Sequence, residues 1–95
     1  MGLKEAYLEK RQAQLDEWDA EIRKLEAKAA KAKAGVKVQY YKQLRSLHSQ
    51  QKTAREKLSE LKETSGEAWG SFRDGLEAAW KDLSRGLKAA AAKFK

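Results

Sequence analysis

The sequence predicts an all-α protein, and three observations carry that prediction. No proline occurs in the 95 residues, charged residues make up 37% of the chain, and apolar residues recur at intervals of three and four. Proline interrupts helices more strongly than any other residue, so its absence leaves nearly every segment free to be helical. This composition and period are typical of long helices and coiled coils. At this length we expect one helical domain, residues 1–95, with limited capacity for a core of its own.

A long helix is expected over about residues 3–63. Its apolar positions begin at Leu8 and form a heptad seam, which Arg11 interrupts. The seam continues past Gly35, where no Ser, Thr, Asp or Asn stands nearby to cap a new helix. Because one helical glycine costs only about 1 kcal/mol relative to alanine, a continuous helix roughly 90 Å long is favoured. The alternative is a three-helix bundle with a turn at Gly35.

A better marked boundary follows at residues 64–67. Thr64 and Glu67 have the spacing of a capping box, and Gly66 eases a sharp change of direction. A returning amphipathic helix is therefore expected over about residues 65–94. From residue 67 onward its apolar residues repeat every eleven positions, for example Trp69 and Trp80. Eleven residues in three turns is about 3.67 per turn, so one face stays apolar along the whole segment.

This apolar face must be covered by something. The returning helix packs most economically on the second half of the long helix, which leaves the first half uncovered within one chain. A long helix that exposes such a stripe is not a plausible monomer. We therefore expect a homo-oligomer assembled through the two apolar seams. The expected packing and oligomer interface consists of large apolar residues: Leu15, Trp18, Ile22, Leu25, Leu44, Leu47, Leu58, Leu61, Trp69, Phe72, Leu76, Trp80, Leu83, Leu87 and Phe94.

Two stretches of the chain resemble a group of small bacterial coiled-coil proteins. They are LEKRQAQLDEWDAEIRKLEAKAAKAKA and QKTAREKLSELKETSGEAWGSFRDGLEAAWKDL, and their most specific parts are residues 14–18 and 65–69. Members of this group are labelled uncharacterised or, in some cases, stress-response proteins. The resemblance spans nearly the whole chain, implies a helical fold and suggests a role in stress. It brings no catalytic residue with it.

The sequence offers no constellation for catalysis, for a metal or for a cofactor. The single histidine, His48, has Arg45 and Lys52 as neighbours at helical spacing, and cationic neighbours oppose metal binding. Cysteine is absent, and neither a glycine-rich phosphate loop nor a nucleophile–base pair occurs. We therefore expect no enzyme, no cofactor and no small-molecule substrate.

The basic excess is concentrated in the middle of the chain. The formal net charge is +7, and no acidic residue occurs between Ala27 and Arg55. Clustered positive charge is all that phosphate neutralisation requires, but these residues spread around a helix and few aromatics accompany them. A solvated face is the more ordinary explanation, so nucleic-acid binding is expected to be weak. The candidate anion contacts are Lys28, Lys31, Lys33, Lys37, Lys42, Arg45, Lys52 and Arg55.

The functional expectation is a non-enzymatic, self-associating coiled-coil scaffold. No secretory signal or membrane span is apparent, so the protein is expected in the cytoplasm. The eleven-residue period is similar to that of exchangeable lipid-binding helices such as those of apolipoproteins, and Trp69 and Trp80 suit an interfacial depth. Gly70, Gly75 and Gly86 lie off the apolar stripe and weaken the helix. The alternative is therefore a peripheral membrane or lipid-surface protein, and the second alternative a weak nucleic-acid binder.

Overall fold

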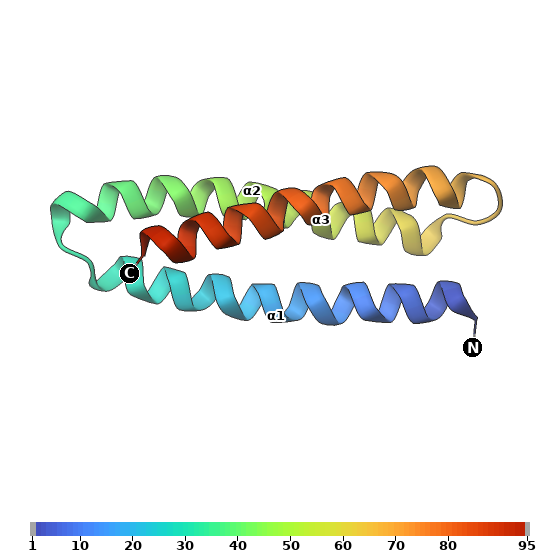
Figure 1. Cartoon of the computed structure of the whole chain (residues 1–95), viewed down its shortest axis with the longest axis horizontal. Coiled ribbons are helices and arrows are strands. Elements are labelled where there is room, and N and C mark those ends of the chain that lie inside the picture. The colour runs from blue at the N-terminus through green and yellow to red at the C-terminus, as the bar shows by residue number, and fades with distance from the viewer. Residues whose placement is uncertain (1, 95) are drawn as a thin grey trace.

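Three helices run up, down and up again in the computed structural model, which describes residues 2–94 (Figure 1). They are α1 (Leu3–Lys31), α2 (Ala34–Glu63) and α3 (Ala68–Lys93), and no strand occurs among these residues. The all-α prediction is confirmed. The molecule measures 51 × 21 × 18 Å. The α1–α2 turn and the end of α3 lie at one end of the bundle, and the α2–α3 turn and the start of α1 lie at the other (Figure 1).

The three-helix alternative replaces the continuous helix that was favoured over residues 3–63. The chain leaves the helical path at Ala32 and Lys33, whose backbones are extended (φ −72° and −65°). The Ala32 amide donates to the carbonyl of Ala29 at 3.2 Å, and the Lys33 carbonyl accepts from the amide of Lys37 at 2.8 Å. Any residue adopts these extended conformations. The turn thus needs no glycine, and Gly35 lies inside the first turn of α2 rather than at the turn itself.

Burial of the α1 seam is the physical reason for the break. In the folded-back chain Ile22 is 1% exposed, and Leu15, Leu25 and Ala29 are buried in the same core. Each fully buried Leu or Ile contributes about 1.5–3 kcal/mol. Interrupting a helix forfeits only a few backbone hydrogen bonds, each worth about 0.5–1.5 kcal/mol net. The gain from covering the seam therefore exceeds the cost of the turn, and the expectation that one chain leaves this half uncovered is wrong.

The second boundary falls where it was expected, but its capping is different. Gly66 has a φ of 69°, in the left-handed region that glycine adopts without strain, so its predicted role in the turn is confirmed. The predicted capping box is wrong. The Thr64 hydroxyl donates to the carbonyl of Glu60 at 2.7 Å and so closes α2, while α3 begins after Glu67. The Lys4 amine also donates to the Thr64 carbonyl at 2.6 Å, which ties the start of α1 to this turn.

One core cluster draws on all three helices, and the α2–α3 contact is the most extensive. Of the expected interface residues, Trp18, Trp69 and Leu87 are half-buried against the core. Phe72 is the exception, because it is 39% exposed and lies outside the cluster. The remaining ones are buried within the single chain: Leu15, Ile22, Leu25, Leu44, Leu47, Leu58, Leu61, Leu76, Trp80, Leu83 and Phe94.

Candidate functional site: a basic pole

The end of the bundle that contains the α1–α2 turn collects lysines from all three helices. Lys28 and Lys31 lie in the last turns of α1, Lys33 lies in the linker, and α2 adds two more within its first nine residues. The end of α3 is held at the same place, because the Lys93 amine donates to the Gln43 side-chain oxygen at 3.4 Å. We call this end the basic pole and define it by eight positions and one aromatic ring: Lys28, Lys31, Lys33, Lys37, Lys42, Lys93, Val36, Val38 and Tyr41.

The lysines of the basic pole are not neutralised by neighbouring acids. Within residues 2–94, no carboxylate forms an ion pair with any of these six amines. Two of the other candidate anion contacts, Lys52 and Arg55, have acidic partners along the bundle. Arg55 lies 2.9 Å from Asp19 of α1, which also accepts a hydrogen bond from Gln51, and Lys52 lies 4.0 Å from Glu56. Arg45 is exposed beside the groove that Glu26 and Tyr41 line. The structure thus divides the predicted basic run into a free group at the pole, a paired group along the bundle, and Arg45, which is exposed and forms no ion pair within the described residues.

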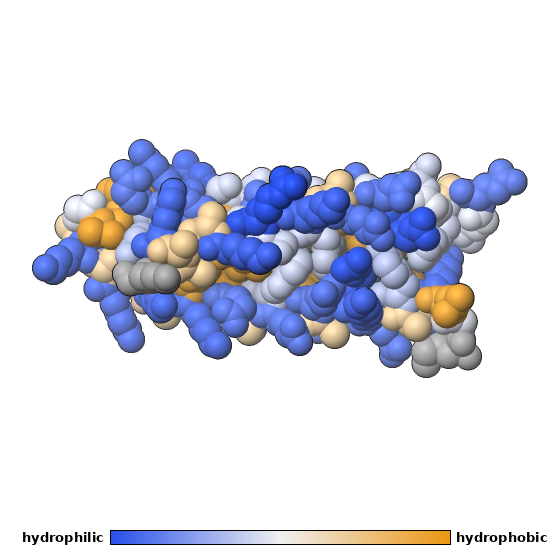
Figure 2. Space-filling model, viewed as in Figure 1, coloured by the Kyte–Doolittle hydropathy of each residue, from blue (hydrophilic) through white to orange (hydrophobic). Residues whose placement is uncertain are grey.

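Three large apolar side chains are exposed among these lysines. Val36, Val38 and Tyr41 are 43%, 57% and 48% exposed. At this end, hydrophobic side chains coloured orange lie among blue hydrophilic ones (Figure 2). The other large hydrophobic residues exposed in the described chain are Leu3, in the first turn of α1, and Phe72, in the second turn of α3, both toward the opposite end. The pole therefore combines positive charge with an apolar tip.

Three helix termini lie at the pole, namely the start of α2 and the ends of α1 and α3 (Figure 1). The first amides of a helix have no partner within the helix and carry a partial positive charge. The first turn of α2 contains no acidic residue, and the residue that precedes it is Lys33, which has no side-chain oxygen to cap the amides. The ends of α1 and α3 lie at the same pole and carry the opposite partial charge, so the positive potential of the pole comes from its lysine amines and not from the helix dipoles.

The surroundings of His48 do not resemble a metal site. Its Nε2 atom lies 3.2 Å from the Glu26 carboxylate, and both side chains are about half exposed. Within residues 2–94 no group of three His, Cys, Asp or Glu side chains could hold a metal ion. None of the helices in that range combines the length and the apolar composition that crossing a bilayer requires.

The sequence pattern does not identify two valines and one lysine of the pole as candidate site residues. The heptad pattern places Val36 on the buried seam and gives Val38 and Lys93 no role, whereas both valines are exposed. The stretch Gly35-Val36-Lys37-Val38 does hold a signal, because apolar and basic residues alternate there directly after a helix end. Comparison with known proteins finds no matching family model, no similar curated protein and no similar solved structure. The function is therefore inferred from the residues themselves.

Proposed function

We propose that the protein is a non-enzymatic helical bundle that docks on an anionic membrane surface through its basic pole. The observation that carries the proposal is the exposure of Val36 and Val38 among unpaired lysines. A lysine near an anionic leaflet contributes about 1 kcal/mol, and inserted apolar side chains add to that attraction. Six lysines and two valines on one small tip supply both contributions.

A membrane fits the pole better than a nucleic acid does. Both surfaces attract lysines through their phosphates. A phosphate backbone, however, gives no partner to Val36 and Val38, whereas the interface of a bilayer accepts aliphatic side chains. Tyr41 is the one exposed aromatic ring of the pole, so the base stacking on which single-strand binding depends is poorly provided for. Tyrosine is in contrast enriched at membrane–water interfaces.

We place this activity in the cytoplasm, where the facing leaflet carries a negative surface potential. A role in stress is suggested only by the resemblance to small bacterial coiled-coil proteins. The scaffold function stays a prediction, but its main support is gone because the apolar seam is buried within one chain. Light scattering of the purified protein tests it. A mass near 10.8 kDa contradicts self-association, and a multiple of that mass supports it.

Sedimentation with vesicles tests the docking proposal. We expect the protein to bind phosphatidylcholine vesicles that contain phosphatidylglycerol, and not vesicles of phosphatidylcholine alone. Replacing Lys31, Lys33 and Lys37 together by glutamine removes three favourable contacts of about 1 kcal/mol each, so binding weakens by on the order of 100-fold. Replacing Val36 and Val38 by serine weakens binding at unchanged net charge.

A matched triple variant controls for net charge alone. Lys10, Lys52 and Lys57 lie away from the pole, and their replacement by glutamine lowers the charge by the same amount. This control is expected to retain nearly all vesicle binding. An equal loss in the control contradicts the basic pole as the docking site. Retention on DNA at low salt that survives the valine substitutions, without vesicle binding, favours the nucleic-acid alternative instead.

A further inference from the structure

A groove follows the contact between α1 and α3 and extends toward the basic pole, but none of its lining residues belongs to the pole. It consists of two neighbouring hollows, and Trp18 and Ser84 line both of them. The α1–α3 contact is the least extensive of the three in the bundle. Aromatic and polar side chains dominate it, for instance Trp18 and Trp80, whose ring centroids are 5.7 Å apart. Because these helices do not interdigitate closely, the surface between them remains hollowed.

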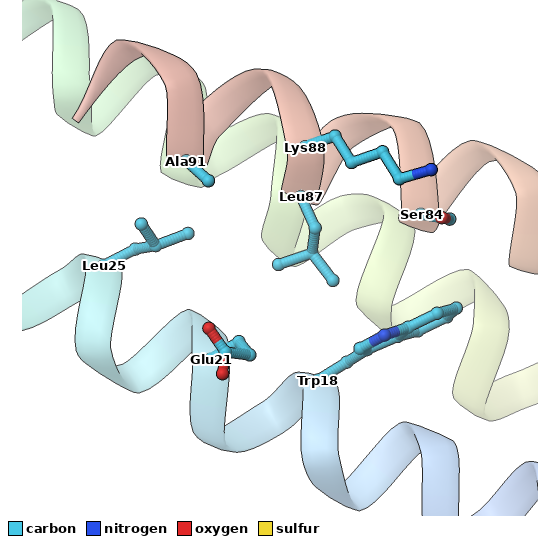
Figure 3. Close-up of a pocket in the computed structure, with 7 residues that line it drawn as sticks. All are labelled: Trp18, Glu21, Leu25, Ser84, Leu87, Lys88 and Ala91. Carbon is cyan, nitrogen blue, oxygen red and sulfur yellow. The ribbon is translucent and has the colours of Figure 1, made fainter. Parts of the chain in front are cut away.

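The hollow nearer the end of α3 is apolar. It has a volume of about 240 Å³, and Figure 3 shows Leu25 of α1 and Leu87 and Ala91 of α3 pointing into it. The Trp18 ring extends along this hollow toward the side on which Ser84 lies (Figure 3), and Trp18 also lines the second hollow. Its polar residues are Glu21, Ser84 and Lys88, and the Glu21 carboxylate lies 3.7 Å from the Lys24 amine. This half of the groove suits a hydrocarbon chain.

The second hollow is cationic. Arg11 and Lys81 line it together with Ser84, and the one acid there, Glu77, accepts a hydrogen bond from the Tyr7 hydroxyl at 3.3 Å. This half of the groove suits an anionic head group.

Arg11 is held in place but incompletely satisfied. Its guanidinium lies over the rings of Tyr7 and Trp80, at 5.1 and 5.7 Å, and donates to the Gln14 oxygen at 2.7 Å. That oxygen also accepts from the Trp80 indole at 3.0 Å. The Arg11 Nε atom is buried and has no partner among the described residues. The guanidinium nevertheless carries its full positive charge into the lining of the second hollow, and a carboxylate is the group with which it pairs best.

We infer that this groove binds a single-chain anionic amphiphile of the fatty-acid class. The carboxylate lies in the hollow lined by Arg11 and Lys81, and the acyl chain runs past Trp18 over Leu87 and Ala91. The length agrees with this occupant. From residue 81 to residue 91 the groove spans about 15 Å at ~1.5 Å per residue. An acyl chain has a similar length, because the hydrocarbon core of a bilayer is about 30 Å thick and each of its two leaflets is one acyl chain deep. A helix of a partner protein fits this length less well, because only about three of its turns would contact the groove. The inference deepens the proposed lipid function but uses a separate site.

Tryptophan fluorescence tests the site without any membrane. Laurate is titrated below its critical micelle concentration, and Trp18 and Trp80 report because both line the groove. We expect saturable binding. Replacing Ala91, which is exposed, by phenylalanine fills the apolar hollow, and replacing Lys81 by glutamate removes a cationic contact; each is expected to weaken laurate binding by about tenfold or more.

Ala89→Phe and Lys52→Glu are the matched controls, because both residues are exposed and neither lines the groove. Both are expected to bind laurate as the unaltered protein does. Equal losses in the controls, an absence of saturation, or equally tight binding of dodecanol would overturn the inference. The inference would also be overturned if the unaltered protein is a dimer and Ala91→Phe dissociates it, because a second copy of the chain would then occupy the groove.

The proposal for the groove and the proposal for the basic pole can be rejected independently of each other. The Lys31, Lys33 and Lys37 glutamine variant is expected to bind laurate normally, and Ala91→Phe is expected to bind anionic vesicles normally. Loss of vesicle binding with laurate binding intact rejects only the pole, and the reverse rejects only the groove.

Discussion

Replacing Trp80 by alanine is expected to lower the free energy of unfolding by about 3–5 kcal/mol. The side chain is 4% exposed, and it links α3 to α1 through its ring contact with Trp18 and its hydrogen bond to Gln14. Its removal opens a cavity between the two helices and takes away one of the two donors that Gln14 binds. Urea unfolding followed by circular dichroism measures the loss, with an unchanged m-value as the sign that the fold is retained.

Phe72→Ala is the control for this experiment, because Phe72 belongs to the same predicted stripe but is 39% exposed. Its replacement is expected to cost about 1 kcal/mol or less. A loss as large as that of Trp80→Ala, together with stability that rises with protein concentration, would mean that a second copy covers Phe72. That result would restore the self-associating scaffold.

The periodicity of the sequence predicts which face of each helix is buried. The seam through Leu44, Leu47, Leu58 and Leu61 is buried as expected, and so are Leu76 and Leu83 of the eleven-residue pattern. This succeeds because the side of a helix on which a residue lies follows from its position along the chain alone. No knowledge of the neighbouring helices is required.

The turn between α1 and α2 could not be predicted in the same way. It consists of Ala32 and Lys33 in extended conformations that leave no mark in the sequence, and the nearby glycine is not used. The choice between a rod and a hairpin is made by the burial of Ile22 and Leu25 against other helices. That is a tertiary contribution, and it outweighs the local preference for an unbroken helix.

The candidate sites depend still more on contacts across helices. The run of basic residues was visible, but only the fold distinguishes Lys33, which is unpaired within the described chain, from Arg55, which Asp19 binds. Arg11 looked like a flaw in the heptad seam. The structure places it between the rings of Tyr7 and Trp80, so the interruption coincides with the cationic half of the groove.

Gly75 and Gly86 are expected to respond in opposite directions to substitution by alanine. At Gly75 an added methyl group meets open space, so Gly75→Ala should raise the free energy of unfolding by up to about 1 kcal/mol through helix propensity. At Gly86 the methyl group would collide with the Gln50 oxygen and lie 3.0 Å from a methyl carbon of Leu47. The Gln50 oxygen is the far end of a flexible side chain and moves away at little cost, so the loss comes mainly from Leu47, which is fully buried in the core and has little room to shift. Overpacking of this kind costs about 1–3 kcal/mol, which exceeds the gain in propensity.

A double variant tests whether the close α2–α3 contact causes the loss of stability in Gly86→Ala. Gln50→Ala removes the nearer but movable obstacle, so we expect it to recover only a small part of the loss in Gly86→Ala, because the Leu47 contact remains. Gln50→Ala combined with Gly75→Ala is expected to be additive, because Gly75 has no neighbour within 4 Å that a methyl group would meet. If Gly86→Ala stabilises the protein as much as Gly75→Ala does, α2 and α3 do not approach each other at Gly86, and the glycine there is only a weak point of the helix.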